Sequence, residues 1–308
     1  MESLTLRLRQ KIIQGEGDIL LYGTTPPKLS TPQQRLVEIS AEQTRRINLI
    51  DPDAVVLYDI QDEAIRNPAP RPFPFLETVD PLRYGKDYLH GLLQPRIYYR
   101  AVGKYSEAEL RADIGSLTTD ATVFVGAASR AATGSLTLQQ AYGIYREMAT
   151  AALLGGVVIP ERHAVDRLEH KRVAAKMIAG CSFFISQCVY NAEILKNLLS
   201  DYHYLCKAEG LVPVPIILTV TPCGSLKTLE FMRWLGIGVS GHVENELLHA
   251  TPMLSRSTEL CVSICKELLD FSRRLGVTVG FNVESVSIRK EEIEASLCLV
   301  QELRTLLR

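Results

Sequence analysis

The chain has 308 residues, 46% of them hydrophobic and 22% charged, and a formal net charge of -1 at pH 7. A chain of this length and composition can bury a large core, as one barrel-sized domain or two smaller ones. The balanced charge lacks the basic clustering that binding to nucleic acid or to an anionic membrane requires, so we expect a globular protein that acts on small molecules.

The cysteines and the first residues both indicate a cytoplasmic protein. The seven cysteines are odd in number and include no CxxC pair, which predicts reduced and mostly buried thiols. Charges are spread through residues 1–18, so this stretch is neither a signal peptide nor a membrane anchor. No apolar window reaches the roughly 18 residues that a transmembrane helix needs.

Eight short apolar runs recur along the chain with helical stretches between them, which is the pattern of repeated βα units. Their apolar residues are continuous rather than alternating, as is typical of parallel strands covered on both faces. The runs span residues 18–23, 54–59, 96–102, 122–127, 154–160, 182–188, 215–222 and 277–284.

Two of the helical stretches begin with recognisable signals. Ser30 and Thr31 precede Pro32, a cap followed by proline in the first turn, and Ser106 with Glu109 has the spacing of a capping box. Both patterns predict the crossover helices that connect parallel strands.

The alternation of strands and helices predicts a (β/α)8 TIM barrel, with an open doubly wound sheet as the alternative. Residues 242–275 have room for an extra helix before the last strand. The proline-rich residues 66–81 carry Phe73 and Phe75 and are interpreted as a loop or lid at the barrel mouth. We expect residues 1–308 to form a single domain.

Polar side chains follow most of the predicted strands, at the end of a barrel where catalytic groups gather. This placement predicts a shared basin of polar groups. They are Thr24 and Thr25; Asp59, Gln61, Asp62 and Glu63; Tyr99 and Arg100; Ser129 and Arg130; Glu161, Arg162 and His163; Gln187; Thr219 and Thr221; and Asn282 and Glu284.

Neither of two candidate metal sites is favoured. Asp59, Asp62 and Glu63 could ligate a metal through oxygen, but acidic residues after a strand more often cap turns. His163 and His170 have no further His or Cys at ligand spacing. We therefore predict no metal.

Five segments follow one another in register between residues 18 and 284: LLYGTTPPK, VFVGAAS, VVIPERH, EHKRVAAKMIAGCSFFISQCVYN and IILTVTPCGSLKTLEFM. In this order they resemble motifs of the methylenetetrahydrofolate reductases, which are FAD-containing TIM barrels. The first looks like that family's strand ending in Glu and Pro-Pro, with Pro26 and Pro27 retained, and the third looks like its Tyr-Pro-Glu-x-His.

The resemblance implies FAD as the cofactor and a folate-like substrate. Arg172 would bind a phosphate, and a solvated helix charge is the alternative for it. The residues that the resemblance and the strand ends assign to FAD are His163, Arg172, Lys171, Gly126, Ala127 and Tyr58, and those assigned to the substrate are Gln187, Leu226 and Thr24.

The chain departs from the family where the chemistry takes place. The register set by the two prolines puts Gly23 where the family has its catalytic glutamate, and Val125 and Ala127 stand where an arginine and an aspartate face the flavin. Glu284 and Asp62 are the favoured replacement acids. The eighth strand of a barrel pairs with the first, which would bring Glu284 beside Gly23, whereas the alternative is that Glu284 caps the last helix.

The leading hypothesis is a flavin-dependent oxidoreductase that passes a hydride from NAD(P)H through FAD to a reduced folate or a similar heterocycle. One alternative is a non-catalytic barrel that binds flavin or folate as a sensor or partner subunit. Another is a metal-assisted lyase or transferase. The oligomeric state stays open, a homo-oligomer included.

Overall fold

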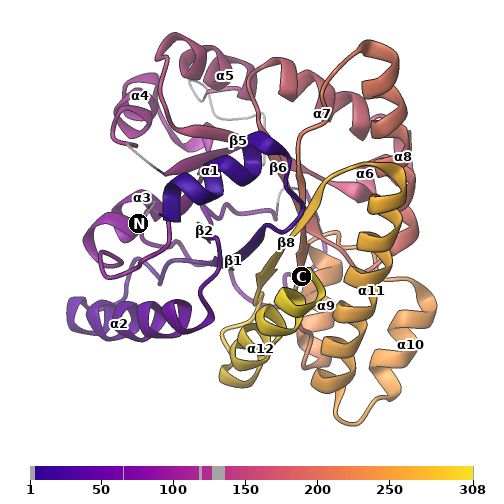
Figure 1. Cartoon of the computed structure of the whole chain (residues 1–308). Helices are drawn as coiled ribbons and strands as arrows, with labels where there is room; N and C mark the ends of the chain where they lie inside the picture. The colour runs from indigo at the N-terminus through magenta and orange to yellow at the C-terminus, as the bar shows by residue number, and fades with distance from the viewer. Residues whose placement is uncertain (1–3, 65, 118–119, 127–135, 308) are drawn as a thin grey trace.

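The protein forms a closed barrel of eight parallel strands, each hydrogen-bonded to its neighbours in chain order, in a computed structural model that describes residues 4–64, 66–117, 120–126 and 136–307 (Figure 1). The predicted TIM barrel is confirmed, and each predicted run overlaps one of the strands, with β1, β4 and β5 extending one residue beyond their runs. The strands are β1 Leu20–Thr24, β2 Ala54–Leu57, β3 Arg96–Ala101, β4 Ala121–Val125, β5 Leu153–Val158, β6 Phe183–Cys188, β7 Ile216–Val220 and β8 Val279–Glu284.

Helices surround the barrel, and the predicted extra helix is present between β7 and β8 as α10. The helical segments are α1 Leu4–Gln14, α2 Gln33–Ile50, α3 Pro81–Asp87, the short 3-10 turn η1 Val102–Lys104, α4 Glu107–Gly115, α5 Leu138–Glu147, α6 Pro160–Asp166, α7 Glu169–Ile178, α8 Ala192–Glu209, α9 Leu226–Trp234, α10 Gly241–His249, α11 Met253–Leu275 and α12 Lys290–Leu307.

The two predicted helix starts have different outcomes. Ser106 and Glu109 form a complete capping box at α4, so this prediction is confirmed. The cap predicted at Ser30 and Thr31 is wrong, because α2 begins at Gln33 with Pro32 in the N-cap position and without a side-chain cap. The amide of Thr31 instead bonds to the carbonyl of Lys28, in a turn that precedes the helix.

The buried side chains form two layers. Alternate strand residues such as Leu21, Val56 and Ile185 fill the barrel interior, and the residues between them pack against the helices. Leu8 and Ile12 of α1 belong to the interior layer, and Figure 1 shows α1 lying across one opening of the barrel. This helix therefore closes the end at which the strands begin, and the other end is left for a site.

The loop from residue 59 to residue 80 crosses from β2 to the helix after β7. Asn67 Nδ2 donates to the carbonyl of Trp234 at 2.8 Å, and the indole Nε1 of Trp234 donates to the carbonyl of Ala69, also at 2.8 Å. Since β2 and β7 are separated by β1 and β8 in the barrel, these bonds hold the loop against the carboxyl ends of the strands. We call residues 59–80 the lid loop.

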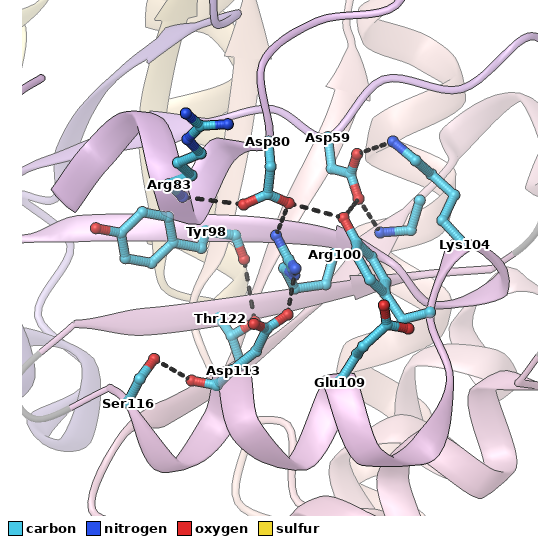
Figure 2. Close-up of polar contacts among 12 residues, drawn as sticks. Asp59, Asp80, Arg83, Tyr98, Arg100, Lys104, Glu109, Asp113, Ser116 and Thr122 are labelled. Carbon is cyan, nitrogen blue, oxygen red and sulfur yellow. Dashed lines mark hydrogen bonds and ion pairs between the residues drawn. The ribbon is translucent and has the colours of Figure 1, made fainter. Parts of the chain in front are cut away.

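Both ends of the lid loop are fixed by a polar network (Figure 2). Asp59 accepts hydrogen bonds from the amide of Ala101 at 2.8 Å and from Lys104 Nζ at 2.5 Å. The Tyr105 hydroxyl contacts Asp59 at 2.7 Å and Asp80 at 3.2 Å, so one phenol joins the first and last residues of the loop.

Arg100 extends this network toward α4 (Figure 2). Its guanidinium donates to Asp80 at 2.6 Å and also to Asp113, and it lies over the ring of Tyr105 with 4.0 Å to the ring centroid. Burial and the Arg100 charge act in opposite directions on Asp80, and the pKa of this carboxyl is held below its usual value. Asp80 is therefore ionised at neutral pH, and its ion pair with Arg100 helps to hold the loop in place.

Candidate site at the barrel mouth

Five polar or aromatic side chains meet inside the barrel where the strands end, and we call them the mouth cluster: Tyr58, Tyr99, Thr219, Asn282 and Glu284. Asn282 Nδ2 donates to the Tyr58 hydroxyl at 2.8 Å and lies 3.1 Å from Thr219 Oγ1. The Tyr58 hydroxyl in turn donates to the Glu284 carboxylate. The rings of Tyr58 and Tyr99 meet edge to face with centroids 4.9 Å apart.

Gly23 explains why Tyr58 can lie in this position. A Cβ atom on residue 23 would be 2.6 Å from the Tyr58 hydroxyl oxygen and 2.7 Å from its ring, closer than real Cβ contacts come. Tyr58 therefore fills the space beside Gly23, where the predicted resemblance would require a catalytic glutamate. No room is left there for a carboxylate on β1.

Glu284 lies directly across from Gly23. The two residues are paired in the register of β1 and β8, so the predicted adjacency is confirmed. The alternative, that Glu284 caps the last helix, is wrong because α12 begins only at Lys290.

The mouth cluster contains an acid whose pKa is close to 7 and a hydrogen-bond acceptor without a partner among the described residues. Burial raises the pKa of Glu284 to about 7, against the opposing effect of the Tyr58 hydrogen bond, although part of its side chain still reaches solvent. Asn282 is fully buried, and its Oδ1 has no hydrogen-bond partner among the described residues. Buried acceptors are nearly always satisfied, so this oxygen is available to accept a hydrogen bond from a ligand or from water.

Asn282 is among the polar strand-end residues predicted from the sequence, although no role was assigned to it. It lies two residues before Glu284 on one strand, and side chains two apart in a strand share a face. Tyr58 was assigned to a cofactor, and its contacts with Asn282 and Gly23 depend on a side-chain conformation that a linear pattern does not give.

The other predicted acid, Asp62, does not reach the mouth cluster. Its side chain is exposed and accepts the amide of Ala64 at 3.0 Å, as the cap of a turn in the lid loop. Glu63 pairs with Arg66 at 2.9 Å, and Asp59 is held by the network of Figure 2. These three carboxylates do not converge, which removes the geometric basis for the metal-assisted lyase or transferase.

The residues predicted for the substrate lie around the rim. Gln187 Nε2 donates to the carbonyl of Leu235 at 2.9 Å, and Thr24 Oγ1 accepts from Gln43 at 3.4 Å. Leu226 is the first residue of α9 and is 56% exposed. Their roles stay predictions, because none of them contacts the mouth cluster through a hydrogen bond that the structure records.

The described residues among those predicted for FAD do not form a cradle for it. His163 is buried and bonded to Asp201 at 3.1 Å, on the helices behind β5. Arg172 Nη2 lies 2.5 Å from Asp166 Oδ2 and its Nη1 lies 3.2 Å from Glu169 Oε2, so its guanidinium already has two carboxylate partners.

The remaining residues of this set do not change that conclusion. Lys171 is exposed on α7. The carbonyl of Gly126 accepts Gln61 Nε2 at 2.9 Å, and Ala127 lies outside the described residues. The side chains present in this arrangement do not fit the flavin, so we derive no step through it.

Comparison with known proteins gives a strong relationship to a folate-binding protein. The chain is similar to an uncharacterized protein from Clostridium thermocellum that binds two copies of 5-methyl-5,6,7,8-tetrahydrofolic acid, with 43% sequence identity, a TM-score of 0.85, and coverage of 97% of this chain and 99% of the other. No protein-family model matches the chain, and no curated protein matches it.

Two dihydropteroate synthase structures are more distant. The enzyme from Xanthomonas albilineans has 11% identity and a TM-score of 0.49 over 93% of this chain and 92% of its own. The enzyme from Anaplasma phagocytophilum has 8% identity and a TM-score of 0.49 over 94% of this chain and 99% of its own. No inference is drawn from these two. Separately, no helix in the described part of the chain is long and apolar enough to cross a membrane.

Proposed function

The chain belongs to the family of the folate-binding protein from Clostridium thermocellum, and from this relationship we propose that it binds a reduced folate of the 5-methyltetrahydrofolate type at its barrel mouth. The observation that carries the proposal is the 43% identity over 97% of the chain. Because the relative binds two copies, we further propose that this chain takes two folate molecules.

The mouth cluster offers the groups that a pterin ring requires. A reduced pterin carries several N–H donors around its pyrimidine edge, and a carboxylate can accept two of them side by side. Glu284 supplies this carboxylate, and the unpaired Oδ1 of Asn282 accepts a further N–H. The edge-to-face pair of Tyr58 and Tyr99 provides an apolar wall for the ring.

The lid loop supplies a partner for the negatively charged tail of a folate. Arg71 lies 5.3, 5.2 and 5.1 Å from the ring centroids of Phe75, Phe231 and Trp234. Its Nε and Nη1 are buried without a hydrogen-bond partner among the described residues. A guanidinium with two unpartnered nitrogens can bind a carboxylate through both. We therefore propose that Arg71 binds the glutamate tail of the ligand.

Hydride transfer from NAD(P)H through FAD stays a prediction from the family resemblance. The acid that such a reductase requires would have to be Glu284, since β1 carries none. An absorbance spectrum of the protein purified without added cofactor tests this: bands of oxidised flavin would support the reductase, and a colourless protein that binds folate would support the non-catalytic alternative.

Calorimetric titration with 5-methyltetrahydrofolate tests the proposed binding. We expect saturable binding with about two ligands per chain, and a Tm that rises with ligand concentration because the ligand binds only the folded state. Arg71→Met should weaken the binding, whereas Arg83→Met, on the exposed face of α3, is the control. No saturation with the wild-type protein would reject the proposal.

A further inference from the structure

Three side chains from three helices converge behind β5. His163 of α6 and His170 of α7 are 1% and 9% exposed, and their rings meet edge to face with centroids 5.3 Å apart. Asp201 of α8 lies 3.1 Å from His163 Nε2. One ligand atom from each of the three residues lies within 4.8 Å of the others, and no second such group occurs in the part of the chain that the structure describes.

The two imidazoles have unused ring nitrogens. The Nδ1 atoms of His163 and His170 are buried and have no hydrogen-bond partner among the described residues. An imidazole binds a metal ion in its neutral form, through a ring nitrogen that carries no proton. Each ring therefore keeps one nitrogen that none of the described residues contacts.

We propose that His163, His170 and Asp201 bind a divalent transition-metal ion, of which Zn²⁺ is the best match. Two imidazoles and one carboxylate, with water in the fourth position, form a common zinc ligand set. Tetrahedral bonds of about 2.0–2.1 Å place ligand atoms about 3.4 Å apart, so the widest pair must approach by rotation of the side chains.

The charges around the group permit this rearrangement. Arg167 Nη2 bonds to Asp201 at 2.8 Å, but its side chain is 69% exposed and can leave toward solvent when a metal ion arrives. Arg172 is paired with Asp166 and Glu169, so its charge is compensated. Of the two lysines on α7, Lys171 is exposed and is screened by solvent, and Lys176 Nζ donates to the carbonyl of Val157.

A metal ion here would connect α6, α7 and α8 and would leave the mouth cluster free. The ion would also restrain α6. The first turn of this helix is already held by Glu161, whose Oε1 accepts the amide of Gly238 at 3.0 Å. The sequence did not predict this site, because the third ligand comes from α8, far from the two histidines in the chain. The proposal does not depend on folate binding.

The test is metal titration of chelator-treated protein in a Cys298→Ser background, which removes the exposed thiol. Co²⁺ reports tetrahedral coordination by its visible absorption, and Zn²⁺ should displace it at one ion per chain. His170→Ala and Asp201→Asn should weaken Zn²⁺ binding by more than the roughly 10- to 100-fold that loss of an outer partner costs. His203→Ala, on α8 outside the group, is the matched control.

Asp201→Asn keeps the size of the side chain, so its fold can be checked by circular dichroism before titration. A saturating tetrahedral Co²⁺ spectrum in the parent and in His203→Ala, lost in both ligand variants, supports the site. Failure of the parent to bind, or binding that survives in the folded Asp201→Asn and His170→Ala variants, overturns it.

Discussion

The burial of Glu284 lowers the free energy of unfolding at neutral and alkaline pH. The pKa of Glu284 is about 7 in the folded protein and 4.5 in the unfolded chain. Between these two pH values the carboxyl is ionised in the unfolded chain but stays protonated in the folded protein, which favours unfolding. Below pH 4.5 both states are protonated and the penalty is absent. Above pH 7 the penalty is complete, at most about 3 kcal/mol by linkage.

Replacing Glu284 with glutamine should therefore stabilise the protein at high pH. We expect Glu284→Gln to raise the free energy of unfolding by about 1–3 kcal/mol at pH 8 and to have little effect near pH 4.5. Urea denaturation at both pH values measures this, with Glu291→Gln on the exposed face of α12 as control. A variant less stable than wild type at pH 8 would contradict the burial of this acid.

Gly23 is required by the packing of Tyr58. Gly23→Ala places a methyl group 2.6 Å from the Tyr58 hydroxyl, and such overpacking costs about 1–3 kcal/mol. Gly143→Ala on α5 has no atom within 4 Å of its new Cβ and should stabilise the protein, since alanine favours helix by roughly 0.5–1 kcal/mol. Thermal unfolding compares the two variants directly. Equal shifts in Tm would show that the Tyr58 side chain moves away from residue 23 at little cost.

We expect access to the mouth cluster to depend on the lid loop, whose bonds to Trp234 hold it against the strand ends. The Tyr105 hydroxyl joins its two ends, and Tyr105→Phe leaves Asp59 and Asp80 short of a donor. A lost donor to a buried charged group costs about 1–3 kcal/mol, so local opening of the loop should become more frequent. Trypsin cleavage after Arg66 should then be faster than in the control Tyr204→Phe, at a residue that is 60% exposed.

Arg71 gives a second prediction for the lid loop. If its guanidinium binds the glutamate tail, Arg71→Met should reduce the affinity for 5-methyltetrahydrofolate by about 10- to 100-fold, the value of a charged hydrogen bond. The affinity for a tetrahydropterin without the tail should not change. An equal loss for both ligands would assign Arg71 to the packing of Phe75 and Trp234.

At the scale of the molecule, the barrel was predictable because strands covered on both faces are continuously apolar. The pairing of Gly23 with Glu284 was predictable too, since it depends only on strand order. The packing of Tyr58 against Gly23 and the pairing of Arg172 with two carboxylates could not be predicted, because both depend on side-chain conformations. The single-domain prediction over residues 1–308 and the cytoplasmic location remain predictions.

The same distinction applies to function. The missing carboxylate on β1 and the occupied Arg172 both separate this chain from a flavin reductase of the family it resembles, and neither affects the groups that would hold a pterin. The central claim is therefore folate binding at the mouth cluster with Glu284 as the carboxylate.

The most direct measurement is the dissociation constant for 5-methyltetrahydrofolate as a function of pH, in the wild type and in Glu284→Gln. If the ionised carboxylate accepts the ring donors, wild-type affinity falls as pH drops below about 7, by up to about tenfold per pH unit, and reaches a plateau above it. Glu284→Gln should bind at least about tenfold more weakly at pH 8 and show no such dependence near pH 7. Equal affinities and equal pH profiles in the two proteins would contradict the account.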